Sequence, residues 1–289
     1  MTIREPSLPP GWYPPGAPGI TRFLEPWKTR RSAGLAALSP HAGWRYSGAL
    51  AAAAFSSLDG GADTAAILGG HLAAGSPVLA FTEDAVRTPL GLMDIDRELR
   101  DALCSALSGE GLSPGWAQDQ YRDNTVEALV PMARFFFPRA RLVALRLPAD
   151  MSSFETGRKI AEIAGNLGRK LVVAGSTDLT HYGPNYGFSP RGTGKEALAW
   201  ARENDRRFIE AVLSGDPGAV LRRAEEELSA CSAGAALGVL GFVSGAGSGR
   251  PGQASAAPPV PELLAYSTSA GESGDIPASF VGYAAVSWK

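Results

Sequence analysis

The three histidines of the chain are its clearest chemical signal. His41, His71 and His181 each follow a short apolar run that reads as a buried strand. In open α/β sheets, ligands bind beyond the carboxyl ends of the strands, and imidazole is a common ligand for zinc, copper and iron. A lone histidine in a turn is more often a hydrogen-bonded structural residue. Because all three share this placement, we expect them to meet in one pocket and to bind a metal ion.

Two further side chains could take part in that chemistry. Asp178 lies three residues before His181, and a helical turn there would place both side chains on one face; the alternative is an aspartate that caps the turn. Cys231 begins a small-residue helix expected over 231–242, where a helix N-terminus favours the metal-binding thiolate; the alternative is a buried small hydrophobe. Cys104 falls in the middle of a leucine-rich helix and is interpreted as a core residue.

Strands and helices alternate along the chain, which is typical of a mostly parallel sheet covered by helices. We therefore predict one three-layer α/β domain over residues 1–289, with a mostly parallel central sheet and helices on both faces. A segment rich in Gly, Pro and Ala, 244–261, is expected to be a flexible loop. The expected strands are 34–39, 64–68, 141–147, 171–174, 263–267 and 280–287. The main expected helices are 47–58, 94–107, 124–137, 152–167, 195–213, 216–229 and 231–242. The third of these helices is expected to bend at Pro131, and the fourth to begin with a Ser152–Glu155 capping box.

Composition narrows the class of protein. The 289 residues are 45% hydrophobic and 19% charged, with a net charge of -2, so the basic patch of a nucleic-acid-binding protein is not expected. No apolar run approaches the ~18 residues of a membrane helix. Two cysteines are too few for a secreted disulfide scaffold, and the N-terminus lacks an apolar signal-peptide core. These features predict a cytoplasmic protein with free thiols.

Several short motifs together resemble the Memo family, the protein B component of the bacterial AmmeMemoRadiSam system. The resemblance runs nearly end to end. Its most specific parts are a Pro-His-Ala-Gly segment followed by Tyr-Ser-Gly, and an Arg-Thr-Pro-Leu-Gly segment. The matching stretches are 11–13, 40–48, 67–71, 87–96, 176–183, Cys231 and 279–287.

The resemblance implies a fold similar to class III extradiol dioxygenases, which are non-haem iron enzymes. It implies a metal pocket formed by His41, His71, His181 and Cys231, with Asp178 beside them. His181 and Asp178 are then the expected catalytic residues. Fe²⁺ is the expected cofactor, with copper or zinc as alternatives. The implied partners are an unknown small-molecule substrate, AMMECR1-like proteins and radical-SAM proteins, without nucleic acid or membrane.

The sequence departs from the family pattern in three places. Asn124 stands where the family has a pocket histidine, His71 stands where a histidine pair is usual, and Ser232 follows Cys231 where the family has glycine. Asparagine cannot carry a proton at neutral pH. Three functions therefore stay open: an iron- or copper-dependent oxidoreductase, a metal- or partner-binding protein without turnover, and a metal-dependent hydrolase. Glu127 would supply a carboxylate ligand only if it turned inward.

Overall fold

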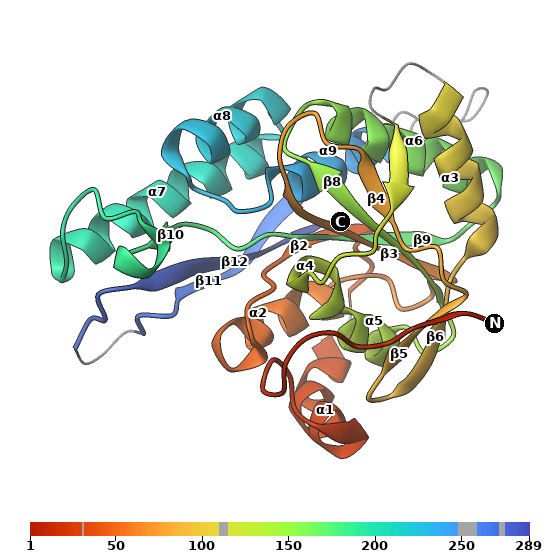
Figure 1. The fold of residues 1–289 in the computed structure, drawn as a ribbon, viewed down its shortest axis with the longest axis horizontal. Coiled ribbons are helices and arrows are strands. Elements are labelled where there is room, and N and C mark those ends of the chain that lie inside the picture. The colour runs from red at the N-terminus through yellow and green to blue at the C-terminus, as the bar shows by residue number, and fades with distance from the viewer. Residues whose placement is uncertain (31, 110–114, 248–258, 272–274) are drawn as a thin grey trace.

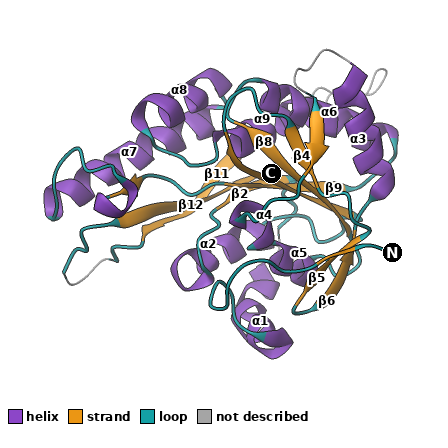
Figure 2. Ribbon diagram, viewed as in Figure 1, coloured by secondary structure: helices purple, strands orange, loops and turns teal. Residues whose placement is uncertain are grey.

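A nine-stranded sheet forms the middle of the computed structural model, which describes residues 1–30, 32–109, 115–247, 259–271 and 275–289 (Figures 1 and 2). Its strands lie in the order β10-β12-β2-β9-β3-β8-β4-β7, and β11 pairs with β12. The strand bounds are β2 Ala36–Ser39, β3 Thr64–Leu72, β4 Val78–Ala80, β7 Trp116–Gln118, β8 Arg141–Pro148, β9 Leu171–Ser176, β10 His181–Tyr182, β11 Pro261–Thr268 and β12 Phe280–Trp288.

The centre of the sheet is parallel and both of its flanks include antiparallel pairs. β2, β9, β3 and β8 run parallel to one another. β12 joins β2 in an antiparallel pairing, and β4 joins β8 in the same way. Because parallel strands need helical crossovers, the central strands are covered on both faces. The predicted α/β class, with helices on both faces of the sheet, is confirmed.

Side chains alternate between two apolar layers, one on each face of the sheet. Along β3, Ala65 and Ile67 pack with one core cluster, while Ala66 and Leu68 pack with the other. This is the two-residue period of a strand. In Figure 1 the helices divide accordingly: α1 (Gly16–Leu24), α2 (Trp44–Ser56) and α5 (Val130–Phe136) lie on one side, and α3 (Arg97–Gly109), α6 (Ser152–Asn166), α7 (Lys195–Ser214), α8 (Pro217–Glu227) and α9 (Ala233–Gly247) on the other.

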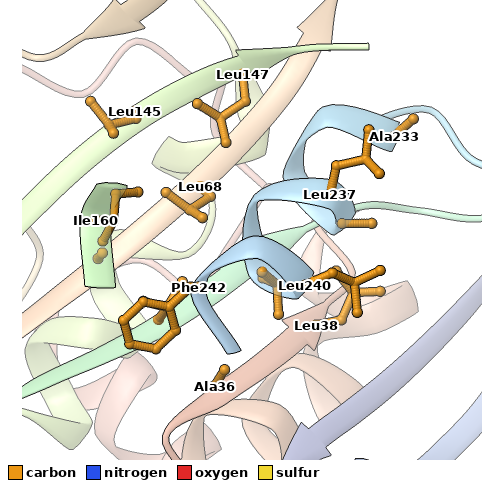
Figure 3. Close-up of a cluster of buried hydrophobic side chains, with 14 of the residues drawn as sticks. Ala36, Leu38, Leu68, Leu145, Leu147, Ile160, Ala233, Leu237, Leu240 and Phe242 are labelled. Carbon is orange, nitrogen blue, oxygen red and sulfur yellow. The ribbon is translucent and has the colours of Figure 1, made fainter. Parts of the chain in front are cut away.

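Helix α9 lies deepest in the second layer. Figure 3 shows Leu237 and Leu240 of α9 in a cluster of buried side chains that includes Leu68 of β3 and Leu38 of β2. Close packing against α6 depends on glycine, because a Cβ at Gly241 would overlap the backbone of α6. The position of this helix matters for function, because the turn before it carries Cys231.

Several expected elements differ in detail. The helix expected over 124–137 is two helices, α4 (Asn124–Glu127) and α5, with Pro131 in the first turn of the second. Proline fits there because the first turn needs no intrahelical N–H donor. The helix expected from residue 94 begins at Arg97, because 91–94 forms β6.

A second, three-stranded sheet was not expected from the sequence. It has the order β1-β5-β6, formed by Ile3–Arg4, Ala85–Thr88 and Gly91–Asp94. These strands are too short to show a clear alternation. One of them is the N-terminal segment, which pairs in parallel with β5, some 80 residues further along the chain.

Two local predictions from the sequence are wrong. Ser152 does not cap α6; the Asp150 carboxylate accepts the Ser152 N–H instead, at 2.9 Å. The loop expected over 244–261 begins too early, because α9 continues to Gly247. Its middle, 248–258, lies outside the described residues, and its end belongs to β11, which begins at Pro261.

The predicted start of α8 is confirmed, with Asp216 accepting the Ala219 N–H at 3.0 Å and Pro217 in the first turn. None of the described helices combines the length and apolarity needed to cross a bilayer.

Candidate metal centre

Three of the four predicted ligands meet at the carboxyl ends of the central strands. His41 follows β2, His71 lies near the end of β3, and Cys231 precedes α9. Each offers one donor atom, and these atoms all lie within 4.8 Å of one another. The Cys231 sulfur is 3.4 Å from His41 Nε2, and the two imidazole rings meet edge to face at 5.1 Å.

His41 is held through both its ring and its backbone. Its Nδ1 lies 2.8 Å from Ser176 Oγ, so Nε2 is the nitrogen that faces Cys231. The backbone N–H of His41 donates to Asp178 Oδ1 at 2.8 Å. The residue is only 1% exposed. A ring fixed at one nitrogen and free at the other is the usual state of a metal-binding histidine.

The backbone around His71 is unusual. Its φ is +57°, in the left-handed region that non-glycine residues seldom adopt, and the pairing of β3 with β8 is irregular between Gly69 and Leu72. Such irregularities redirect side chains at strand ends. The ring then places Nδ1 3.0 Å from Asp123 Oδ2, which leaves Nε2 for the cluster.

The two glycines before His71 allow its neighbours to approach. A Cβ at Gly69 would overlap the hydroxyl of Thr125, and one at Gly70 would collide with Ser232. The first contact brings α4 and the adjoining Asp123 towards β3, and the second brings Cys231. Glycine is therefore required on steric grounds at both positions.

Cys231 lies two residues before α9, not at its first position as expected from the sequence. Its backbone N–H donates to the carbonyl oxygen of Asp178 at 3.2 Å. Burial on its own raises the pKa of the thiol, but the neighbouring His41 and His71 outweigh this effect and hold the pKa well below its usual value. The site therefore favours thiolate, the form that binds metals.

The pKa values of the two imidazoles are raised, whereas the pKa of the Cys231 thiol is lowered. Burial lowers the pKa of His71, but hydrogen bonds to Asp123 and Cys231 reverse the effect and raise it to about 10. The pKa of His41 is also raised, because Asp178 and Cys231 outweigh its burial. Without a metal ion, these shifts favour a thiolate beside protonated imidazole. A metal ion takes the place of the protons, so its binding releases protons to solvent.

His181 does not join this cluster. It lies in β10, paired with Val281 of β12, and its ring meets Tyr186 edge to face at 4.9 Å. It lines a neighbouring cavity of about 690 Å³ together with Asp178 and Asn124. The fourth predicted ligand is therefore placed at the wall of a cavity beside the cluster.

Asp178 connects the cluster with the cavity. Its Oδ2 lies 3.8 Å from His41 Nε2, and burial raises the pKa of its carboxyl despite the opposing effect of His41. The helical turn that would have placed Asp178 and His181 on one face is not formed: Leu179 forms an isolated bridge with Ala230, and β10 starts at His181. Asp178 and His181 both line the cavity, although they do not share the face of a helix.

Asn124 and Glu127 make structural hydrogen bonds near the cluster. Asn124 donates from Nδ2 to the His41 carbonyl at 3.3 Å, so it supports the turn that carries His41. Glu127 does not turn inward; its carboxylate accepts the backbone N–H groups of Ser7 and Leu8 and holds the N-terminal segment.

Sequence reasoning missed Ser176 and Asp123, which fix the two histidine rings. Ser176 belongs to the matching stretch 176–183, and Asp123 is the residue before Asn124 in the segment that corresponds to a family motif; these positions were the available signal for their roles. Three tyrosines of the cavity wall were given no role there in advance: Tyr46, which lies in the Tyr-Ser-Gly motif, Tyr186 and Tyr283. They come from α2, a short 3-10 helix and β12, which no local pattern brings together.

Comparison with known proteins covers the whole length of the chain. A family model described as Memo-like protein matches residues 4–287. A MEMO1 family protein of Methanosarcina barkeri is 31% identical, over 98% of this chain and 99% of the relative. One from Methanopyrus kandleri is 28% identical, over 98% of each. A crystal structure of an uncharacterized protein from Escherichia coli K12 is 15% identical, over 78% of this chain and 86% of that one, with a TM-score of 0.44, a likeness too weak to support an argument. The chain belongs to the Memo-like family.

Proposed function

We propose that this chain binds a redox-active metal ion, iron in the first place and copper as the alternative, and uses it on a small molecule held in the adjoining cavity. One observation carries the proposal: two imidazole nitrogens and a cysteine sulfur lie within 4.8 Å of one another. Both rings are fixed through their other nitrogen, by Ser176 and Asp123, as in metal sites generally.

The donor set fits a transition metal. Imidazole and thiolate suit iron, copper and zinc, whereas magnesium and calcium prefer oxygen ligands. Three protein ligands leave coordination positions open for a substrate. A bound iron or copper ion would supply electron transfer, and zinc would supply only Lewis acidity.

The residues of the cavity supply binding and proton exchange. The ring of His181 lines the cavity, so it is placed to exchange a proton with a ligand there. Asp178 is held by the backbone of His41, at the boundary between cluster and cavity. Tyr186 and Tyr283 offer aromatic surface and hydroxyl groups for orientation. A metal centre beside a substrate cavity with a proton-exchanging histidine resembles the site of an extradiol dioxygenase, and this resemblance is part of the proposal.

A binding protein without turnover is the second candidate, and Asn124 favours it. The amide of Asn124 donates to a backbone carbonyl and cannot act as a base. In that case the metal centre would stabilise a surface for a partner, and AMMECR1-like and radical-SAM proteins are the partners to test.

Metal content after anaerobic purification tests the proposal. We expect near-stoichiometric iron in the wild type and its loss in both His41→Ala and Cys231→Ala. His181→Ala is the matched control, because its ring lies outside the cluster, and it should keep the metal. No bound metal, and no uptake of Fe²⁺, Cu²⁺ or Zn²⁺ on titration, would overturn the proposal.

Turnover assays then separate the candidate functions. Oxygen consumption by the iron form supports an oxidoreductase. Stable metal without turnover supports the binding protein. Activity with zinc in the absence of oxygen supports a hydrolase, with Asp178 or His181 as the base for a bound water.

A further inference from the structure

Arg146 is a buried cation in β8 (Arg141–Pro148), a strand whose other buried residues are apolar. It is 4% exposed. Its Nε and Nη2 reach the two carboxylate oxygens of Asp119 at 2.8 and 3.2 Å. Asp119 is equally buried, at 1% exposed. A paired guanidinium and carboxylate satisfy each other in this fork geometry, which lysine cannot reproduce.

The remaining nitrogen of the same guanidinium points to the metal cluster. Nη1 lies 3.2 Å from Asp123 Oδ2 and 3.4 Å from the carbonyl oxygen of Gly70. That Asp123 oxygen is the one that contacts His71 Nδ1 at 3.0 Å, and Gly70 directly precedes His71 in the sequence. Arg146 therefore touches both the carboxylate that orients the His71 ring and the backbone that carries it.

We propose that Arg146 is a positioning residue for His71, and through it for the metal cluster; the second half of this inference rests on the proposed function. The argument is geometric. His71 has a left-handed backbone at an irregular strand end, which persists only where surrounding contacts determine it. The guanidinium supplies two of these contacts at once.

The charge of Arg146 has a second consequence. A carboxylate that hydrogen-bonds the distal nitrogen of an imidazole increases the ring's strength as a metal donor. Because Asp123 also pairs with the guanidinium, part of its charge is compensated, and its effect on His71 is moderated. Loss of the guanidinium therefore changes both the orientation of the ring and its electronic state.

The test uses the full chain with ¹⁵N-labelled histidine. Only three imidazoles are present, so the ring nitrogens can be assigned with His→Gln variants. Arg146→Lys keeps the positive charge but cannot make the two parallel hydrogen bonds to Asp119. Asp123→Asn removes the carboxylate that links Arg146 to His71 and leaves the ion pair of Arg146 with Asp119 in place. Arg169→Lys is the matched control, because Arg169 makes a similar fork to the buried Asp96 away from the cluster.

We expect Arg146→Lys and Asp123→Asn to change the ¹⁵N chemical shifts of the His71 ring in the metal-free protein. The ¹⁵N chemical shifts of His181 should stay unchanged. Both variants should weaken Co²⁺ binding by about 10- to 100-fold and alter the thiolate-to-cobalt absorption band. Arg169→Lys should lower stability without either effect.

His71 signals identical to wild type in a folded Arg146→Lys protein would overturn the inference, since a merely structural arginine would leave the ring unmoved. The metal-free spectra keep this test separate from the proposed function. If the wild type bound no Co²⁺ while the His71 signals still depended on Arg146, the metal proposal would fail and the positioning role would stand.

Discussion

At the scale of single residues, the two cysteines lie in opposite environments. Burial raises the pKa of Cys104 to about 11, and its side chain is 5% exposed in the core. At Cys231 the effect of burial is outweighed by the two neighbouring histidines, and the pKa lies well below the usual value. Cys231 is also partly exposed. The surroundings therefore favour the thiolate at Cys231 and the protonated thiol at Cys104.

Alkylation of the native, metal-free protein by iodoacetamide should label Cys231 alone. Because the pKa of Cys231 is held well below its usual value, we expect its alkylation rate to rise less steeply between pH 7 and 9 than the rate of an ordinary thiol, which increases by about 20-fold. Peptide mass spectrometry measures both sites. Cys231→Ser should remove all native labelling. Preferential labelling of Cys104, or the pH profile of an ordinary thiol at Cys231, would contradict this assignment.

A second residue-scale prediction concerns Asp205 in α7. Its carboxylate accepts the Thr180 N–H at 2.9 Å and the Tyr266 hydroxyl at 2.7 Å, and burial outweighs both bonds and raises its pKa to about 6. A carboxyl whose pKa is raised by folding stabilises the native state at low pH. This contribution is complete below about pH 3.8 and is lost as the pH rises through 6.

Asparagine at this position cannot ionise. The free energy of unfolding of the wild type, relative to Asp205→Asn, should therefore fall by about 3 kcal/mol between pH 3.5 and pH 7, which corresponds to roughly two pKa units. Urea unfolding of both proteins across this range measures the difference, and the subtraction cancels the other titrating groups. A difference that does not vary with pH would show that Asp205 has an ordinary pKa.

At the scale of elements, the sequence predicted correctly those strands and helices whose apolar pattern lies within one short segment. The buried strands around 36–39, 64–68, 141–147 and 171–174 and the long helices show their own periodicity, so their existence and order were correct. This placed His41 and His71 at the same edge of the sheet. The meeting of Cys231 with them was expected from the family resemblance, since it depends on how α9 packs.

What the sequence did not predict depends on contacts between distant segments. His181 is separated from the cluster because β10 pairs with β12, a pairing between residues 100 apart. The left-handed backbone of His71 arises where β3 meets α4 and the turn before α9. Asp123 and Arg146 become partners only through that packing. No pattern within a window of the sequence encodes such contacts.

Glycine packing between α6 and α9 gives the element-scale prediction. A Cβ at Gly241 would overlap the carbonyl oxygen of Phe154, and backbone atoms cannot move aside as a side chain would. Helix propensity alone would make Gly241→Ala stabilising by up to about 1 kcal/mol. Overpacking should reverse the sign, and we expect a loss of about 3 kcal/mol in the free energy of unfolding.

The matched control is Gly218→Ala in α8, where the nearest atoms to a new Cβ belong to the side chains of Asp216 and Arg222. It should leave stability unchanged or raise it slightly. Chemical denaturation compares the two variants. Equal stabilities would mean that α6 and α9 separate at little cost and that the turn bearing Cys231 is not held by this packing.

At the scale of the whole molecule, the metal cluster joins segments that are far apart in the chain. His41, His71 and Cys231 span 190 residues: His41 follows β2, His71 lies in β3 and Cys231 precedes α9. In the unfolded chain these donors are dispersed, so a metal ion that needs all three binds the native state in preference. Metal binding should then raise the temperature at which the protein unfolds.

At a free metal concentration 100 times the dissociation constant, this linkage contributes about 2.7 kcal/mol. For a chain of this length, such a contribution raises Tm by about 4 °C. Calorimetry of the wild type with Co²⁺ or Zn²⁺ should show that rise, and EDTA should reverse it. His41→Ala should lack the shift, whereas His181→Ala should keep it, because His181 lines the cavity and not the cluster. A shift that is lost in His181→Ala as well would place this third histidine in the coordination sphere and would require β10 to move towards the cluster when metal binds.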